Sequence, residues 1–458
     1  MVYTAICENR KSDSICKTDF CSTLPLVYRL LVEACSIKTV NIFVSVLFCA
    51  TSVIGFQCAV ADPLYDEPGI NPYREQASQY GVDSVDPFLG QVKVRHLDLF
   101  LPGPGGMDIL MWRTYDSANA GTPGMPAGEG FGVGWMSHVA RLSNSCATSS
   151  ITPVLELPDG TVQKFYVASL SLGYGFVSKE GWVGNCIGSA GMLLISPDGL
   201  KYEMSVSDGD RRLVKKITDK NGNWLNFDYG LKSLGYSPLQ YLTSLTASDG
   251  RYVSFSYSAA DMYGRRKLKN MYANGQSWSY DYVAFDGQPE YSSLSYSLRK
   301  ATRSDGLSWT YEYPTLPGYN VFTPLQGYLG KFTHLHGAVT NYSYGYLYMD
   351  GLNAVRVTQK SMAVGSSSNT WNYRYKFNES FNGEYVTVTD VTDSLTGTVT
   401  YKHLNPGVNG KAWRFGLLVD KLECTSSKCT NNERYEWGYQ EISSDDYIVN
   451  SGIVPIFD

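Results

Sequence analysis

Two pairs of residues have the side chains that metal binding or acid–base catalysis would use. His334 and His336 place two imidazoles on one face of an extended strand, and imidazole is a common metal ligand. The same residues stand just before Gly337, where a turn is expected, so a divergent turn is the favoured interpretation. Asp390 and Asp393 could form a carboxylate pair, but their Thr-rich surroundings favour solvated turn residues.

A third candidate is the glycine-rich segment from Gly103 to Gly106, with Pro104 and Gly105 between them. Such a segment could cradle a phosphate, but Pro104 lacks the backbone N–H that a cradle would use. The sequence therefore favours a plain turn. Because no G-x-S-x-G, Walker or H-E-x-x-H motif is present, the sequence indicates neither an enzyme nor a bound cofactor.

The cysteines divide into two groups along the chain. Of 10 cysteines, the first group lies before residue 62 and consists of Cys7, Cys16, Cys21, Cys35, Cys49 and Cys58. The second group, Cys146, Cys186, Cys424 and Cys429, allows three disulfide pairings. We favour Cys146–Cys186 and Cys424–Cys429, because each pair brackets a local loop. A zinc site is the alternative, although neither the paired C-x-x-C spacing nor nearby histidines support it.

The N-terminal region has the features of an export signal. An apolar run from Val40 to Phe56 is followed by the small-x-small sequence Ala59-Val60-Ala61. A buried helix and a transmembrane anchor are the alternatives. The long polar leader before the run suggests that translation starts near Leu31. We therefore expect a leader and signal peptide over 1–61, a polar linker over 62–80, no membrane span after signal removal, and a periplasmic, cell-surface or secreted product.

Composition excludes some classes of protein and favours one fold class. Charged residues make up 18% of the 458 residues and the net charge is −5, which argues against a nucleic-acid binder and against a disordered acidic tail. The 35 tyrosines suit half-buried pleated surfaces, and the 44 glycines suit tight hairpin turns. An all-β fold is therefore expected.

The segment 81–200 is expected to form an N-terminal β domain that begins with a hairpin. Apolar residues alternate from Val92 to Leu101, and alternation resumes from Ile109 to Tyr115. Between them, residues 102–106 read Pro-Gly-Pro-Gly-Gly, which predicts the turn.

An internal repeat over 201–346 is the strongest signal in the sequence. An Asn-Gly, Asp-Gly or His-Gly turn recurs, with its glycine at Gly222, Gly250, Gly275, Gly306 and Gly337. Three, five and seven residues after each glycine stand apolar, mostly aromatic residues (Thr340 is the exception). The aromatic ones among them are Phe227, Tyr229, Phe255, Tyr257, Trp278, Tyr280, Tyr282, Trp309, Tyr311, Tyr313, Tyr342 and Tyr344. An apolar residue usually stands five before the glycine, but the Gly275 copy has Asn270 there and Met271 beside it.

Each copy is expected to be a hairpin with one aromatic face. Asn-Gly and Asp-Gly suit the type I′ turn, and alternate residues of a strand share a face. A lone hairpin is at best marginally stable, so stacked copies should share one apolar layer in a curved sheet or partial β shell. Buried aromatic rows would be core, which we favour, whereas exposed rows could stack against sugars.

Residues 347–458 predict a further β region in which the repeat loosens. Trp371, Tyr373, Tyr375 and Phe377 alternate without a matching Asn-Gly turn, and residues 384–401 suggest two strands around a Leu-Thr-Gly turn. The sequence ends without a finishing element, so we expect a truncated chain.

These motifs resemble those of RHS/YD-repeat proteins, including wall-associated ones. The repeat reads G-x-x-[aromatic]-x-[aromatic]-x-Tyr, and the stretch from Asp86-Pro-Phe-Leu-Gly90 through Leu-Pro-Gly-Pro-Gly to Arg113-Thr-Tyr-Asp-Ser117 resembles the opening of such proteins. Phe131-Gly-Val-Gly-Trp135 continues the match. The resemblance covers about residues 80–350, the N-terminal portion, and implies a large β shell that encloses a toxic C-terminal domain or acts at a cell surface.

Two functional hypotheses follow. The first is a structural scaffold, part of a β shell used in toxin encapsulation, delivery or cell-surface interaction, whose partners are the rest of the shell or a toxin domain. It predicts inward-facing aromatic rows. The second is a carbohydrate-binding or carbohydrate-active protein on a β scaffold, with cell-surface carbohydrate as its partner. It predicts two carboxylates about 5–10 Å apart in an aromatic groove.

Overall fold

The computed structural model describes the chain from residue 83 onward, in ranges separated by gaps. These ranges are 83–120, 131–136, 138–146, 152–167, 175–178, 180–188, 191–231, 240–259, 266–285, 296–314, 326–349, 352–405, 416–425, 428–435, 437–441 and 453–457. All of them belong to one compact unit, Asp66–Asp458. The expected leader (1–61) and linker (62–80) lie outside the described residues.

The described chain is built almost wholly of β-strands, so the predicted all-β fold class is confirmed. Its helical parts are the single 3-10 turns Pro104–Gly106 and Ser117–Asn119. Neither of these turns approaches the length or apolarity that a membrane-crossing helix needs.

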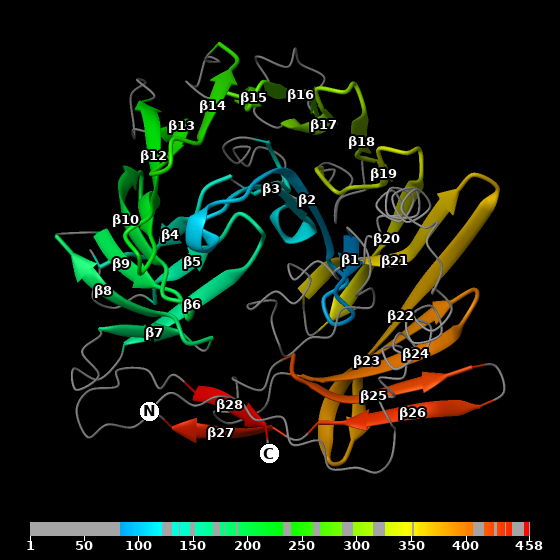
Figure 1. Cartoon of the computed structure of the whole chain (residues 1–458). Coiled ribbons are helices and arrows are strands. Elements are labelled where there is room, and N and C mark those ends of the chain that lie inside the picture. The colour runs from blue at the N-terminus through cyan, green and yellow to red at the C-terminus, as the bar shows by residue number, and fades with distance from the viewer. Residues whose placement is uncertain are drawn as a thin grey trace, which may run out of the picture. The chain divides into compact units, whose positions relative to one another are not determined.

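The first three strands form a small antiparallel sheet, here called the opening sheet. They are β1 (Asp83–Val85), β2 (Val92–Leu101) and β3 (Ile109–Asp116), in the order β1-β2-β3 (Figure 1). The predicted hairpin is therefore present, with Leu101 paired to Ile109 across the turn. The glycine-rich segment forms this turn, and Gly103 N donates to Asp108 Oδ1 at 2.7 Å.

The next eight strands close into a barrel. They are β4 (Arg141–Ser143), β5 (Val154–Glu156), β6 (Val162–Val167), β7 (Phe176–Ser178), β8 (Val183–Ile187), β9 (Gly191–Ile195), β10 (Lys201–Asp208) and β11 (Arg211–Thr218). Each pairs with the next, and β4 closes against β11 through Leu142 and Arg212. The opposite end of β11 pairs with β12, where Ile217 faces Leu225, so the sheet forks at β11.

From β12 the sheet continues as a ribbon of antiparallel strands in chain order. The strands are β12 (Trp224–Leu231), β13 (Gln240–Ala247), β14 (Tyr252–Tyr257), β15 (Leu268–Ala273), β16 (Gln276–Ala284), β17 (Tyr296–Thr302), β18 (Ser308–Glu312), β19 (Lys331–Thr333), β20 (Val339–Met349), β21 (Leu352–Val364), β22 (Ser367–Phe381), β23 (Glu384–Asp393), β24 (Gly397–Leu404), β25 (Leu418–Cys424) and β26 (Cys429–Arg434) (Figure 1). A separate pair is formed by β27 (Trp437–Glu441) and β28 (Ile453–Phe457). The expected boundary between the N-terminal β domain and the repeats, after residue 200, falls just before β10. The expected end of the repeats, after residue 346, falls inside β20.

Four of the five repeat turns differ from the predicted type I′ geometry. All five glycines have φ between 74° and 89°, but only at Asn274-Gly275 does the preceding residue also have positive φ. Elsewhere the loop has three residues: Ala247 N donates to Arg251 O, and Gly250 N donates to Ala247 O. In such a loop only the glycine needs the left-handed region. The type I′ prediction was therefore wrong for these four copies.

The shorter turn at Gly275 explains why that copy departs from the sequence pattern. In the other copies the residue five before the glycine faces the residue three after it, as Leu245 faces Val253. The two-residue loop at Asn274-Gly275 moves this pairing by one position, so that Met271 faces Trp278. The side chain that shares the inner face is thus Met271 rather than Asn270.

In four of the five copies the tyrosine seven residues after the turn glycine makes a hydrogen bond to a carbonyl of the preceding strand region. Its hydroxyl donates to a carbonyl 14 or 15 residues earlier in four copies: Tyr229 to Val214 at 2.6 Å, Tyr282 to Leu268 at 2.6 Å, Tyr313 to Leu298 at 2.6 Å and Tyr344 to Leu329 at 2.7 Å. A register shift lies immediately before Tyr229, Tyr257, Tyr282 and Tyr344. Such a bulge twists the strand locally, and at Tyr229, Tyr282 and Tyr344 the hydroxyl bond stands beside it.

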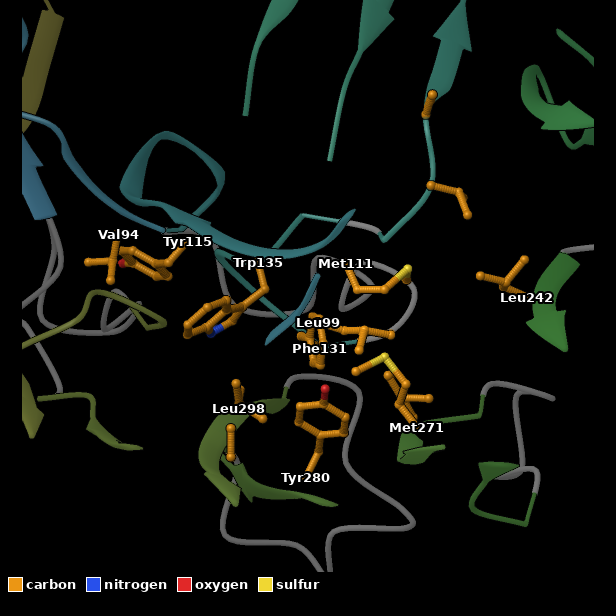
Figure 2. Packing of buried hydrophobic residues seen from close by; sticks show 14 of the residues in the cluster. Val94, Leu99, Met111, Tyr115, Phe131, Trp135, Leu242, Met271, Tyr280 and Leu298 are labelled. Carbon is orange, nitrogen blue, oxygen red and sulfur yellow. The ribbon is translucent and has the colours of Figure 1, made fainter. Parts of the chain in front are cut away.

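The aromatic rows of the repeats are buried. Those that are buried are Phe227, Phe255, Trp278, Tyr280, Tyr282, Trp309, Tyr311 and Tyr342, while Tyr229, Tyr257, Tyr313 and Tyr344 are partly buried against the same cluster. The cluster also contains residues of the opening sheet, such as Val94, Leu99 and Met111 (Figure 2). The repeats and the opening sheet therefore share one core.

Candidate functional site

A buried ion pair lies where the opening sheet meets the repeats. Asp98 is the extra residue of a β-bulge in β2, because Leu97 and Leu99 face consecutive residues of β3. A bulge re-aims a side chain, and here Asp98 is turned inward beside Leu99. Its partner is Arg113 of β3, which has no exposed surface. Arg113 Nε lies 2.9 Å from Asp98 Oδ2, and Nη2 lies 2.8 Å from Oδ1.

Tyrosines from two repeat copies complete this network. Tyr280 of β16 donates its hydroxyl to Asp98 Oδ2 at 3.0 Å, and Arg113 Nη1 donates to the hydroxyl of Tyr311 in β18. The Arg113 guanidinium also lies over the ring of Trp309, 4.8 Å from its centroid. A buried ion pair is tolerated when further hydrogen bonds satisfy both charges. The Asp98–Arg113–Tyr280–Tyr311 group meets that condition, and we call it the Arg113 network.

The electrostatics of the Arg113 network keep Arg113 charged and the hydroxyls of Tyr280 and Tyr311 protonated. Burial opposes the charge of Arg113, but Asp98 and the nearby phenols outweigh burial and raise the Arg113 pKa above its ordinary value. Burial and the Asp98 carboxylate raise the pKa of Tyr280 well above 10.0. Burial likewise raises the pKa of Tyr311. The network therefore holds one anion, one cation and two neutral phenols, which suits a clamp rather than proton transfer.

Two histidines lie close to the ion pair. His96 of β2 faces Arg113 across the hairpin, and its ring contacts Trp309 and Phe332 with centroids 5.1 Å apart in both cases. His138 packs against Phe131 at 4.5 Å and approaches the Trp112 carbonyl through Nδ1 at 3.0 Å. Both imidazoles are buried.

A second buried ion pair joins the start of the opening sheet to the fifth repeat copy. Asp83 Oδ2 lies 2.7 Å from Lys360 Nζ, with both side chains at most 4% exposed. Tyr342 donates its hydroxyl to the same carboxylate oxygen. Lys360 stands opposite Tyr342, at the position where earlier copies carry an apolar residue. The Asp83 carboxylate thus neutralises the Lys360 ammonium at the inner face of the ribbon.

The Asp-Pro-Phe-Leu-Gly motif forms a capped turn that docks on β21 and β23. Asp86 Oδ1 accepts hydrogen bonds from Phe88 N at 2.7 Å and Leu89 N at 3.1 Å. Arg356 Nη1 donates to the Phe88 carbonyl, and Val357 N donates to the Gly90 carbonyl at 3.0 Å. A side chain at position 90 would lie 2.6 Å from the Arg356 Cβ, and φ there is 65°, so glycine is required.

The other opening motifs dock in the same manner. Tyr115 donates its hydroxyl to the Gly327 carbonyl at 2.8 Å and accepts from Leu329 N at 2.9 Å. Trp135 Nε1 donates to the Tyr313 hydroxyl at 2.8 Å. Tyr280 and Leu298 of the ribbon lie opposite Phe131 and Trp135 (Figure 2). The motifs that the sequence associates with the opening domain are therefore the residues that attach it to the repeats.

The structure places the histidine pair at the turn before Gly337 and the carboxylate pair in β23. His334 Nε2 lies 3.1 Å from Thr340 Oγ1, whereas His336 is exposed at its turn. Asp393 caps its turn by accepting from Leu395 N at 2.7 Å. Asp390 is not a turn residue: it lies within β23 and pairs with Lys376 at 2.8 Å. In the described residues no cluster of three or more potential metal ligands occurs.

The four cysteines after residue 61 form the two favoured disulfides. Cys146, just after β4, is bonded to Cys186 of β8, and Cys424 is bonded to Cys429 across the β25–β26 hairpin. The first disulfide joins the segment just after β4 to β8, which lies four positions further along the order of the closed barrel. The zinc alternative is excluded for these residues, because their sulfurs are covalently paired.

Sequence reasoning missed the roles of Asp98, Lys360 and the buried histidines. The apolar residues of β2 change from even to odd positions between Val94 and Leu97, and this change of phase was the available signal of a bulge in the strand. The burial and pairing of Lys360 could not be predicted from its neighbours in the sequence, because its partner Asp83 lies 277 positions earlier (360 − 83). Arg113 was noted only as part of a motif, and its partners come from strands distant in sequence.

Comparisons with known proteins give structural matches alone. No family model and no curated protein match the sequence. A Tc holotoxin pore from Photorhabdus luminescens is 14% identical, with TM-score 0.35, covering 73% of this chain and 21% of that chain. The N-terminal domain of effector protein SpvB from Salmonella typhimurium is 15% identical, with TM-score 0.22, covering 61% and 94%. A TcdB2-TccC3-Cdc42 structure is 12% identical, with TM-score 0.25, covering 82% and 21%. The chain thus spans about a fifth of both toxin chains, and we draw no functional conclusion from these matches.

Proposed function

We propose that this chain is an exported structural scaffold of the RHS/YD-repeat kind, and that it has no enzymatic activity of its own. The observation that carries the proposal is the burial of the repeat aromatics against the opening sheet. Trp278, Tyr280, Trp309 and Tyr311 all belong to one core with β2 and β3. A protein that used these rows to bind ligands would expose them.

The polar groups of this core support the same proposal. Asp98 and Arg113 use their hydrogen-bonding capacity on each other and on two tyrosines. Asp83 is likewise held by Lys360 and Tyr342. Catalytic carboxylates need access to a substrate, whereas Asp83 and Asp98 are both buried. The groups act as anchors that set the position of the opening sheet on the ribbon.

The carbohydrate alternative is weakened by the same burial. Stacking against a sugar needs an accessible aromatic face, whereas Trp278 is 4% exposed and Trp309 is 8% exposed. A glycosidase also needs two carboxylates in one groove. Asp390 and Asp393, the candidates from the sequence, are occupied by an ion pair and a turn. We therefore favour a scaffold whose partners are further shell segments or an enclosed toxin domain.

Export is part of the proposal, and the disulfides support it. Disulfides persist in oxidising compartments and are rare in the cytosol. Cys146–Cys186 lies in the closed barrel, so reduction would loosen an element of the fold rather than a surface loop. A periplasmic, cell-surface or secreted location fits both this chemistry and the signal peptide expected at 1–61.

The gene and its product can test the proposal together. The nucleotide sequence is read through and beyond codon 458, and the intact mass of the product is measured in the periplasm, at the cell surface and in the medium. We expect an oxidised, exported product whose frame continues into further repeats and a variable C-terminal region. A stop directly after Asp458, with a reduced cytosolic product, would contradict both the shell and the export.

A glycan panel tests the alternative. The purified chain, begun at Asp62, is incubated with surface polysaccharides, and both binding and the release of reducing sugar are measured. The scaffold proposal predicts neither. Saturable binding that protects Trp278 or Trp309 from oxidation would favour the carbohydrate function instead.

A further inference from the structure

Two buried histidines, His96 and His138, lie where the opening sheet is attached to the repeats. His96 lies between Arg113 on β3 and the rings of Trp309 and Phe332. His138 lies against Phe131, Phe255 and Tyr280. The charged and titratable groups that face His96 are Arg113, Tyr311 and His334, and those that face His138 are Asp98, Arg113 and Tyr280.

Among the residues that the structure describes, Asp98 is the one carboxylate found to face either ring, and its oxygens are already engaged. Its Oδ1 already accepts from Arg113, and its Oδ2 accepts from Arg113 and Tyr280. Among the described residues, neither His96 Nε2 nor His138 Nε2 meets a hydrogen-bond partner. A proton added to either Nε2 would therefore create a buried, unpaired cation next to the Arg113 cation.

We propose that His96 and His138 form an acid-sensitive latch, which holds the opening sheet on the repeats at neutral pH and releases it as the pH falls. Release exposes the imidazoles to water, where protonation is favourable. It also uncovers the aromatic face of the repeats around Trp309 and Tyr311. The latch is a property of this interface and does not depend on the shell function proposed above.

The direction of the pH effect follows from linkage. Burial, Arg113 and His334 lower the pKa of His96 well below 6.5. Burial lowers the pKa of His138 to about 4, with Arg113 lowering it too and Asp98 and the Trp112 carbonyl opposing. A lowered pKa means that the docked state is fully stable above pH 6.5. Stability is then lost as the pH falls toward the docked-state value, because only the released state binds the protons.

Hydrogen exchange resolved to β2 and β3 measures the latch. The full chain from Asp62 is exchanged between pH 7.5 and 5.0, and the rates are corrected for the pH dependence of intrinsic exchange. Each histidine can raise the opening constant by up to about ten-fold per pH unit below 6.5. We therefore expect opening of β2 and β3 to rise by up to about 100-fold per pH unit, while β9 and β10 of the closed barrel, which contain no histidine, stay protected.

Neutral variants separate the latch from general acid weakening. H96L and H138N remove both titrations, and the Asn amide can replace the Nδ1 donor at the Trp112 carbonyl. In the double variant the opening of β2 and β3 should lose up to about 100-fold of its change per pH unit below 6.5, and any slope that remains comes from groups that both proteins share. H336N is the matched control, since His336 is exposed at its turn, and it should keep the wild-type profile. His334 and His403 are present in both the double variant and the wild type, so they do not contribute to the difference between the two profiles.

Two results would overturn the latch. One is a wild-type profile in which β2 and β3 show no added opening between pH 6.5 and 5.0. The other is a folded double variant with the same pH dependence as the wild type. If the double variant does not fold, the wild-type profile alone tests the latch. The latch requires that the logarithm of the opening constant of β2 and β3 change with pH by a slope approaching two protons per opening event.

Discussion

Arg113 of the opening sheet donates a hydrogen bond to Tyr311 of the fourth repeat copy, although 198 residues separate them in the chain. Tyr311 stands five residues after its turn glycine, a position that faces the core in every copy. The contact therefore ties the opening motif Arg-Thr-Tyr to the aromatic row of the repeats. Asp98, brought inward by a bulge, makes this burial of an arginine possible.

Removing one partner of the Asp98–Arg113 ion pair should destabilise the fold. We expect R113M to lower the free energy of unfolding by about 3–5 kcal/mol, since it leaves Asp98 as a buried unpaired charge. Adding D98L should restore much of the loss, because no charge then stays buried. Urea denaturation measures both. R303M is the control: Arg303 and Asp305 are largely exposed, and their pair should contribute less than about 1 kcal/mol. Equal losses for R113M and R303M would contradict this account.

The hydroxyl of the tyrosine seven residues after the turn glycine should contribute to the stability of its hairpin. Y344F removes the donor to the Leu329 carbonyl and keeps the ring, so we expect a loss of about 1–2 kcal/mol. Y385F is the matched change at a tyrosine that is 64% exposed, and it should have almost no effect. Thermal and urea unfolding of both variants provide the comparison. If Y344F unfolds like the wild type, the hydroxyl bond does not define the repeat.

The two kinds of repeat turn should respond differently to alanine. Asn274 has φ 49°, so N274A places an alanine in the left-handed region and should cost about 1–2 kcal/mol. His336 occupies the same sequence slot in a three-residue loop, where only Gly337 has positive φ. H336A should therefore be nearly neutral. Similar losses in the two variants would indicate that the His336 turn has type I′ geometry after all.

The two disulfides should differ in their contribution to stability. Cys146 and Cys186 are 40 positions apart, and the chain-entropy relation gives about 4 kcal/mol for a loop of that length. Cys424 and Cys429 are 5 positions apart, which gives about 2 kcal/mol. The serine double variants C146S/C186S and C424S/C429S are compared by urea denaturation. A larger loss from the short loop would show that loop entropy is not the governing effect.

The repeat and the opening hairpin could be predicted from the sequence because both depend on local rules. The period of two placed Trp309, Tyr311 and Tyr313 on one strand face, and the turn glycines marked where each hairpin reverses. The turn type was predicted less well, since Asp-Gly suits both a two-residue and a three-residue loop. The positive φ of Asn274 and the pairing of Met271 with Trp278 show which copy has the shorter loop.

The site could not be predicted because its contacts are non-local. Asp83 meets Lys360, and Arg113 meets Tyr311, through a fold that brings distant strands together. Nothing near Lys360 in the sequence announces a buried cation. The closure of the barrel between β4 and β11 is equally non-local, because its two pairs are Arg212 with Leu142 and Leu213 with Arg141.

The central claim is that the repeat aromatics form a core with the opening sheet, and oxidative footprinting tests it most directly. The folded chain is exposed to hydroxyl radicals, and the oxidation of each aromatic residue is measured by mass spectrometry. Trp278 and Trp309, at 4% and 8% exposure, should be protected, while Tyr252 and Tyr385, at 51% and 64%, should be oxidised readily. Rapid oxidation of Trp278 and Trp309 in the folded protein, suppressed by an added glycan, would contradict the scaffold and support a carbohydrate-binding surface.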